Sequence, residues 1–124
     1  TQVITQGNYT EIPIPDDEPT GIFSVIKLPD QGTIKELKIR VTIEHEFLGD
    51  LEISLRSPNE QIVLLQNRTL GTRTNLDYEY NLANTPSLQQ LIKQPIQGDW
   101  LLWVVDYAKE DTGMLKGWEL EFKI

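Results

Sequence analysis

The feature that most constrains the fold is an alternation of apolar and polar residues that runs through residues 37–43 and restarts at residues 51–55. A period of two is typical of a β-strand with one buried face and one face in water. A connection containing Gly49 and Asp50 separates the two runs, so they are predicted to be core strands joined at one rim of a sheet. The apolar members are Leu37, Ile39, Val41, Ile43, Leu51, Ile53 and Leu55.

The only histidine of the chain lies at the same predicted rim. His45 continues the apolar side of the first strand, and Asp50 follows in the connection. An imidazole beside a carboxylate suggests reactive chemistry, but a lone histidine on a core face is more often a hydrogen-bonded structural residue. We therefore interpret the rim as a structural corner. His45 is expected to hydrogen-bond the connection and Gly49 to allow the turn, while Asp50 caps backbone amides or binds Ca²⁺.

Further strands are predicted on both sides of this pair. Residues 61–65 and 100–106 are apolar on both parities, and we interpret both as central strands. Residues 22–28 form another strand candidate. Residues 118–124 alternate cleanly and are predicted to form a final strand with one apolar face.

The remaining chain adds little helix. Residues 66–99 lack sustained alternation, with one or two helical turns expected at residues 87–93 after Pro86. Six or more strands separated by turn residues predict an all-β sandwich of jelly-roll (Greek-key) type. At 124 residues the chain is expected to be one domain, in which residues 1–11 are a linker from a preceding domain.

Composition argues against several classes of function. The absence of cysteine excludes disulfides and thiolate metal sites, and one histidine disfavours histidine-rich zinc sites. The chain has 11 Lys and Arg against 19 Asp and Glu, a formal charge of −8, whereas nucleic-acid surfaces are basic. No apolar run approaches the ~20 residues of a membrane span. We expect no nucleic-acid partner, no membrane span and a monomeric isolated domain; the missing initiator Met indicates a piece of a longer chain.

The residue pattern disfavours hydrolytic chemistry within the domain. A serine hydrolase would need a nucleophile near His45, but no serine lies in a Gly-x-Ser-x-Gly elbow. Ser54 falls on the outward parity of its strand, and Ser57 precedes a turn proline. The paired carboxylates of a glycosidase need a cleft for which a sandwich of this size leaves little chain. The domain itself is expected not to be an enzyme.

A carbohydrate- or surface-binding jelly-roll module is the alternative interpretation. Trp100, Trp103 and Trp118 lie inside apolar strands, where core packing is the ordinary explanation. Tyr78 and Tyr80, in the long connection, are better candidates for an exposed aromatic platform.

Calcium is the metal that the residue types favour. Ca²⁺ takes clustered carboxylate and carbonyl oxygens, and acidic residues recur in loops beside the predicted strands. The sequence contains no EF-hand loop, so a site would be assembled from separate loops, and spacing alone leaves open which carboxylates converge. The candidates are Asp16, Asp17, Asp50, Asp77, Glu79, Asp99, Asp106, Glu110 and Asp111.

The ordered landmarks of the chain resemble the P domain of proprotein convertases and related subtilisin-like proteases. The resemblance covers residues 12–122 and rests on the order of the whole set. The matching segments are Ile14-Pro15-Asp16, Pro19-Thr20-Gly21, His45 with Gly49-Asp50-Leu51, Leu55 with Ser57-Pro58, Gly98-Asp99-Trp100 with Leu102, Val104 and Asp106, and Asp111-Thr112-Gly113 with Leu115, Trp118 and Leu120.

The resemblance implies that residues 1–124 form a single non-catalytic P domain of bacterial type. Such a domain follows the catalytic domain of a secreted subtilisin-like serine endopeptidase, which it stabilises and modulates, with an influence on calcium response. The implied partners are that catalytic domain, in the same polypeptide, and a protein substrate. The implied location is extracellular or periplasmic, within a larger bacterial protein. We expect one of two surfaces to contact the catalytic domain. The first is the exposed face of Lys38, Arg40, Thr42, Glu44 and Glu46, and the second is the connection around Tyr78 and Tyr80.

The resemblance also orders the calcium candidates. It makes Asp16, Asp50, Asp106 and Asp111 the first positions to examine, with Asp17, Asp77 and Asp99 secondary. Two departures from the family pattern matter. Residues 59–61 replace the usual Gly-Thr turn, and residues 70–80, with the lone Asp77, replace a glycine-rich segment with paired aspartates. The second departure argues against a cation site in that loop.

Overall fold

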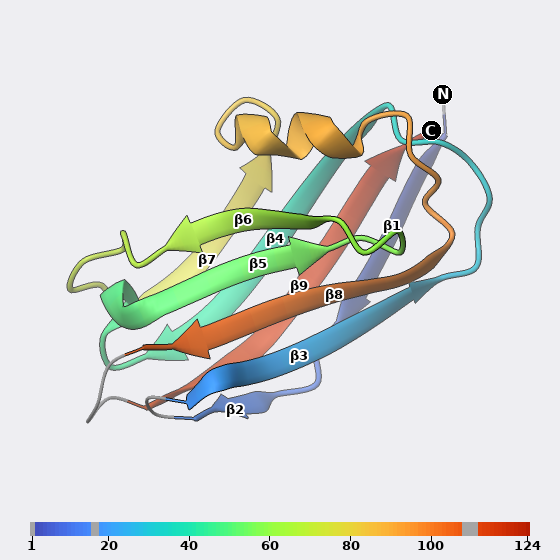
Figure 1. Ribbon diagram of the computed structural model, residues 1–124. Coiled ribbons are helices and arrows are strands. Elements are labelled where there is room, and N and C mark those ends of the chain that lie inside the picture. Colours follow the sequence, from blue (N-terminus) through green and yellow to red (C-terminus); the bar gives the residue numbers. More distant parts are fainter. Residues whose placement is uncertain (1, 16–17, 108–111) are drawn as a thin grey trace.

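The computed structural model describes residues 2–15, 18–107 and 112–124 and consists of two antiparallel β-sheets packed face to face (Figure 1). One sheet has the order β1-β9-β4-β7, with β2 also paired to β9, and the other has the order β3-β8-β5-β6. The predicted all-β jelly-roll sandwich is confirmed. The elements are β1 (Val3–Asn8), β2 (Ile12–Ile14), β3 (Glu18–Leu28), β4 (Glu36–His45), the 3₁₀ turn η1 (Leu48–Asp50), β5 (Leu51–Arg56), β6 (Ile62–Asn67), β7 (Asn75–Asn81), the 3₁₀ helix η2 (Pro86–Leu91), β8 (Gly98–Asp106) and β9 (Gly113–Lys123).

The core lies between the two sheets and follows the alternation of the sequence. Every apolar residue of the two opening runs is buried. The largest buried side chains include Trp100 and Trp118, whose indole N–H groups donate to Ile96 O and Ser24 Oγ, each at 2.8 Å. Because both indoles have acceptors, the core gains their apolar area without leaving a buried donor unsatisfied.

The first residues are part of the sheet. In place of the expected linker over residues 1–11, β1 pairs antiparallel with β9 from Val3↔Lys123 to Asn8↔Trp118. The linker prediction is therefore wrong over this stretch. The sequence did not indicate the strand because only Ile4 of β1 is buried. A strand with one buried side chain carries almost no alternation, so the pattern offered no signal.

Residues 61–65 were predicted to be a central strand, and this is wrong. β6 is the edge of its sheet, with Ile62 54% and Leu64 42% exposed. The prediction for residues 100–106 is confirmed, because β8 lies between β3 and β5. The segment without alternation contains η2, where helical turns were expected, and also β7, a second edge strand that pairs with β4. Within the described residues, no helix has the length and apolar character needed to cross a bilayer.

Candidate functional site

A buried histidine–carboxylate pair marks the rim where β4 and β8 end. His45 Nε2 lies 3.0 Å from Asp106 Oδ2, and both side chains are fully buried. His45 Nδ1 accepts a hydrogen bond from the backbone N–H of Phe47 at 3.0 Å. An accepting Nδ1 carries no proton, so the imidazole is neutral with its proton on Nε2, which donates to Asp106. The expectation that His45 hydrogen-bonds the connection is confirmed.

Asp50 belongs to the same corner. Its carbonyl oxygen accepts the N–H of Tyr107 at 3.1 Å, and its neighbour Leu51 pairs with Asp106 across β5 and β8. Both carboxylate side chains, of Asp50 and Asp106, belong to buried residues. The strand pairing therefore brings together two acidic positions that are 56 residues apart in the sequence (106 − 50).

Gly49 allows its backbone to approach that of Gly71 closely at this corner. A Cβ at Gly49 would lie 2.5 Å from the carbonyl oxygen of Gly71, which accepts the N–H of Gly49 at 2.9 Å. Such a distance is too short for any side chain, so glycine is required where the two backbones meet. The sequence predicted the importance of Gly49 but attributed it to a turn.

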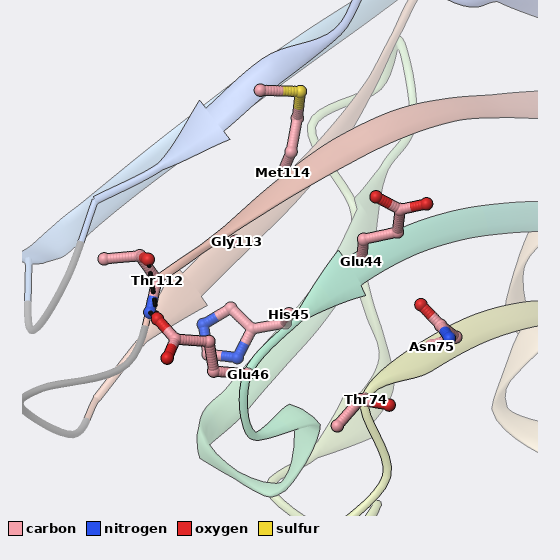
Figure 2. A pocket seen from close by; sticks show the side chains of 8 residues that line it. All are labelled: Glu44, His45, Glu46, Thr74, Asn75, Thr112, Gly113 and Met114. Carbon is pink, nitrogen blue, oxygen red and sulfur yellow. Dashed lines mark hydrogen bonds between the residues drawn. The ribbon is translucent and has the colours of Figure 1, made fainter.

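An open hollow of about 480 Å³ lies beside His45 (Figure 2). On one side, Glu46 Oε1 accepts both the backbone N–H of Thr112, at 2.9 Å, and its hydroxyl, at 2.8 Å (Figure 2). These two hydrogen bonds hold the pKa of the Glu46 carboxyl below its ordinary value. The residues that line the hollow are Glu44, His45, Glu46, Thr74, Asn75, Thr112, Gly113 and Met114.

Gly113 lines the hollow and lies directly against the imidazole of His45. It pairs with His45 across β4 and β9. A Cβ at Gly113 would lie 2.4 Å from the carbonyl oxygen of Glu44 and 2.5 Å from His45 Cδ2. The position of the imidazole therefore depends on the absence of a side chain at residue 113.

The geometry at His45 is unsuited to catalysis. Both ring nitrogens are engaged, and the side chain has no exposed surface, so the ring cannot accept a proton from a nucleophile. Three serines have other surroundings. Ser57 Oγ accepts the N–H of Gln61 at 3.2 Å, and Ser24 Oγ accepts the indole N–H of Trp118. Ser54 lies on β5, between its pairing partners on β6 and β8. No serine is among the residues that line the hollow.

The predicted metal ligands do not all lie together. Asp50 and Asp106 lie at the rim described above. Asp77 forms an ion pair with Arg40 at 2.8 Å on the outer face of the other sheet, and Asp99 lies near the start of β8, at its opposite end. Asp16, Asp17 and Asp111 lie outside the described residues. Within the described ranges, no group of three or more His, Cys, Asp and Glu is placed to hold a metal ion.

The aromatic positions differ from the sequence-based expectation. Tyr80 is 1% exposed and packs edge-on against Tyr78, with ring centroids 4.9 Å apart, so the predicted Tyr78–Tyr80 platform is wrong. Trp103, expected in the core, lies on the outer face of its sheet and stacks on Phe23. The sequence carried a signal for this. Phe23 and Trp103 lie on the opposite parity to the core residues Ile26 and Trp100 of their strands, so they could have been assigned to the outer face.

Comparisons with known proteins relate this chain to parts of proteins that are named as proteases. The proprotein convertase P-domain family matches residues 34–122. A calcium-dependent protease of Trichormus variabilis is 32% identical over 122 residues, covering 84% of this chain and 18% of that protein. Leupeptin-inactivating enzyme 1 of Streptomyces exfoliatus is 28% identical over 117 residues, covering 93% of this chain and 25% of the enzyme.

A solved structure gives the same fold. The serine protease of Aeromonas sobria, in complex with its chaperone, aligns with a TM-score of 0.72 and 18% identity, covering 98% of this chain and 27% of the protease. This chain thus spans only about a fifth to a quarter of the relatives that it matches. Because the family match extends over most of the sequence, the chain belongs to the proprotein convertase P-domain family.

Proposed function

We propose that this P domain is a non-catalytic accessory module of a secreted serine-type endopeptidase. The module stabilises and modulates the catalytic domain, which lies in the same polypeptide. The observation that supports this most strongly is the match to proteins named as proteases, in which the aligned stretch is a minor part of the length. The engaged and buried imidazole of His45 agrees with a domain that leaves the chemistry to another part of the protein.

Labelling with a fluorophosphonate, which reacts with activated serines, tests this proposal. We expect the full-length protein to be labelled and to cleave a casein substrate. Labelling should map, by mass spectrometry of the digested protein, to a serine outside this chain. Labelling of a serine within residues 1–124, or a full-length protein that is neither labelled nor proteolytic, would contradict the proposal.

We further propose that a structural Ca²⁺ binds at the rim through Asp16, Asp50, Asp106 and Asp111. Asp50 and Asp106 supply two buried carboxylates, which are the oxygen ligands that Ca²⁺ prefers. A relative named as a calcium-dependent protease supports the choice of ion. The ion would neutralise the crowded carboxylates of the rim; its remaining ligands would be backbone carbonyls and water.

The strand pairing supports Asp16 and Asp111 as the other two ligands. Ile14 pairs with Gly113, and Glu18 pairs with Asp106. The described residues that flank Asp16 and Asp111 in the sequence therefore pair with one another, and Asp106 among them lies at the rim that also holds Asp50.

Thermal unfolding with excess Ca²⁺ and then with EGTA tests the calcium site. A ligand that binds only the folded state stabilises it by about 2.7 kcal/mol at a hundredfold excess over Kd, so the midpoint should rise with Ca²⁺. Asp50→Asn should abolish this rise. Asp99→Asn, which changes a carboxylate at the far end of β8, should leave it intact. A wild-type midpoint that is the same in Ca²⁺ and in EGTA would contradict the proposal.

A further inference from the structure

The outer face of the four-stranded sheet carries apolar side chains from three of its strands, β3, β8 and β6, whereas β5 contributes Ser54 and Arg56. Cross-strand pairing forms two rows on this face, each crossing β3, β8, β5 and β6 in turn. The first row is Phe23, Trp103, Ser54 and Leu64, and the second is Val25, Leu101, Arg56 and Ile62. Six of these eight residues are apolar; we call them the apolar face: Phe23, Val25, Ile62, Leu64, Leu101 and Trp103.

The apolar face concentrates exposed hydrophobic surface. Phe23 is 48% and Val25 37% exposed, and with Ile62 and Leu64 they make up half of the large hydrophobic residues that are exposed in the described chain. Single exposed hydrophobic residues are normal, but a contiguous group marks a contact surface. Polar pairs border it: Lys27 with Asp99 at one end and Glu52 with Asn67 at the other. An apolar centre within a polar rim is the usual anatomy of an interface.

Its aromatic centre is held in place before any partner binds. The rings of Phe23 and Trp103 stack with centroids 5.4 Å apart and an interplanar angle of 10°. The Trp103 indole N–H donates to the carbonyl oxygen of Thr20 at 2.8 Å. A fixed aromatic pair loses little conformational entropy on association, which favours binding.

The sequence independently indicates that this face is covered. Residues 61–65 and 100–106 are apolar on both parities, a pattern typical of strands that are buried on both sides. In the isolated domain, one side packs in the core, but the other side of β6 faces solvent. The sequence of β6 is that of a strand buried on both faces, although one of its faces is exposed. This difference is explained if another protein domain covers the exposed face.

The outer face of the other sheet has the opposite character. Lys38 pairs with Glu121 at 3.8 Å, Arg40 with Asp77 at 2.8 Å, and Lys123 with Glu36 at 3.2 Å. These charges are satisfied by one another and remain exposed, so burying them would cost desolvation. This face, expected from the sequence to dock, is the less suitable of the two.

We propose that the apolar face is the surface through which the domain packs against an apolar patch of the protease catalytic domain in the same polypeptide. This inference rests on the proposed function. Because both domains belong to one polypeptide, the effective concentration of the partner is high. An interface of the size usual between domains is then sufficient to hold them together.

Two other occupants are disfavoured by the same surface. A second copy would bring together two chains that each carry a formal charge of −8, and their repulsion opposes self-association. A sugar needs an aromatic ring lying flat toward solvent, whereas Phe23 and Trp103 each use one face on the other. A catalytic domain in the same polypeptide is the remaining occupant, and the relatives named as proteases extend well beyond the stretch that this chain matches.

Hydroxyl-radical footprinting of the full-length protein tests the inference without any substitution. Phe23, Ile62 and Leu64 should be at least about fivefold less modified than their exposure in the domain alone predicts, as expected for buried interface residues. Val3 and Tyr78, which are 52% and 41% exposed on the other sheet, are matched internal controls and should be modified fully. Equal modification of both sets would overturn the inference.

A paired substitution gives a second, functional readout. Ile62→Thr with Leu64→Thr places β-branched threonine, which favours strands, at both positions of an edge strand, so the domain should still fold. In the full-length protein we expect thermal inactivation of proteolysis to be about tenfold faster, because two interface contacts are lost. Val3→Thr, at an exposed position on the edge strand β1 of the other sheet, is the control, and its inactivation rate should equal that of the wild type.

The outcomes separate this inference from the proposed function. If deletion of residues 1–124 speeds inactivation but the paired substitution at Ile62 and Leu64 does not, the docking surface is wrong and the accessory role stands. If deletion has no effect, the accessory role itself fails. Protection of the apolar face in a full-length protein that sediments as a dimer would assign the face to a second copy and overturn the inference.

Discussion

His45 and Asp106 form a buried pair whose strength depends on both partners. Removing the imidazole would take away the hydrogen bond that His45 donates to the buried Asp106 carboxylate and would create a cavity. We predict that His45→Ala lowers the free energy of unfolding by about 3 kcal/mol, the usual cost of breaking a buried charged hydrogen bond. Urea unfolding at neutral pH measures the change. His45→Gln, whose amide can donate to Asp106, should recover part of the loss; a cost below about 0.5 kcal/mol for His45→Ala would contradict the assignment.

Glu46 gives the rim a pH dependence whose sign follows from its hydrogen bonds. Thr112 holds the pKa of Glu46 below its ordinary value of 4.5 in the folded state. A depressed pKa contributes stability above pH 4.5, and that stability is lost as the pH falls through the folded-state value. Thr112→Val removes the hydroxyl donor and should reduce stability at pH 6 more than at pH 3. Unfolding curves between these pH values test this; a loss that is independent of pH would contradict it.

For single residues, the sequence predicted the structural role better than the residues that each one contacts. The alternation placed His45 on a core face and at a rim, and Asp50 beside it. It could not show that His45 meets Asp106, 61 residues away, because that contact depends on how β4 and β8 cross at the end of the sandwich. It also could not show that Gly49 is needed for the approach of Gly71, since a close backbone contact leaves no periodic pattern.

The contact between β4 and β9 is the structural element on which the rim depends. Gly113→Ala would place a methyl group 2.4 Å from the carbonyl oxygen of Glu44 and force the two strands apart. We predict a loss of about 2 kcal/mol in the free energy of unfolding, the typical cost of overpacking a rigid backbone contact. Gly7→Ala on β1 is the control, because its nearest neighbour is the flexible Tyr9 side chain, and it should cost less than half as much. Equal costs would contradict this role for Gly113.

Strands with a strong pattern could be predicted, and strands at the edges could not. Residues 37–43 and 51–55 became β4 and β5 with the expected buried faces, because their alternation records one wet side and one dry side. β1 and β7 bury too few side chains to produce a period. The error at residues 61–65 is of a different kind, since the apolar pattern describes a strand covered on both sides and the domain covers only one.

The whole molecule presents two chemically different surfaces. One sheet carries paired charges and the other carries the apolar face, while the acidic residues of the rim lie at one end. This division agrees with a module that keeps one side in water and offers the other to a larger protein. The composition predicted the acidic surface, but not which sheet carries the exposed apolar side chains, because that depends on how the strands are shared between the sheets.

We propose that the domain stabilises a protease without taking part in its chemistry. The most direct test is the half-life of proteolytic activity at elevated temperature, compared between the full-length protein and the same protein lacking residues 1–124. We predict a half-life that is at least about tenfold shorter after deletion, as for the loss of a whole domain interface, with the initial activity per correctly folded molecule retained. An unchanged half-life would contradict the claim, and so would the complete loss of activity from a deleted protein that is still folded.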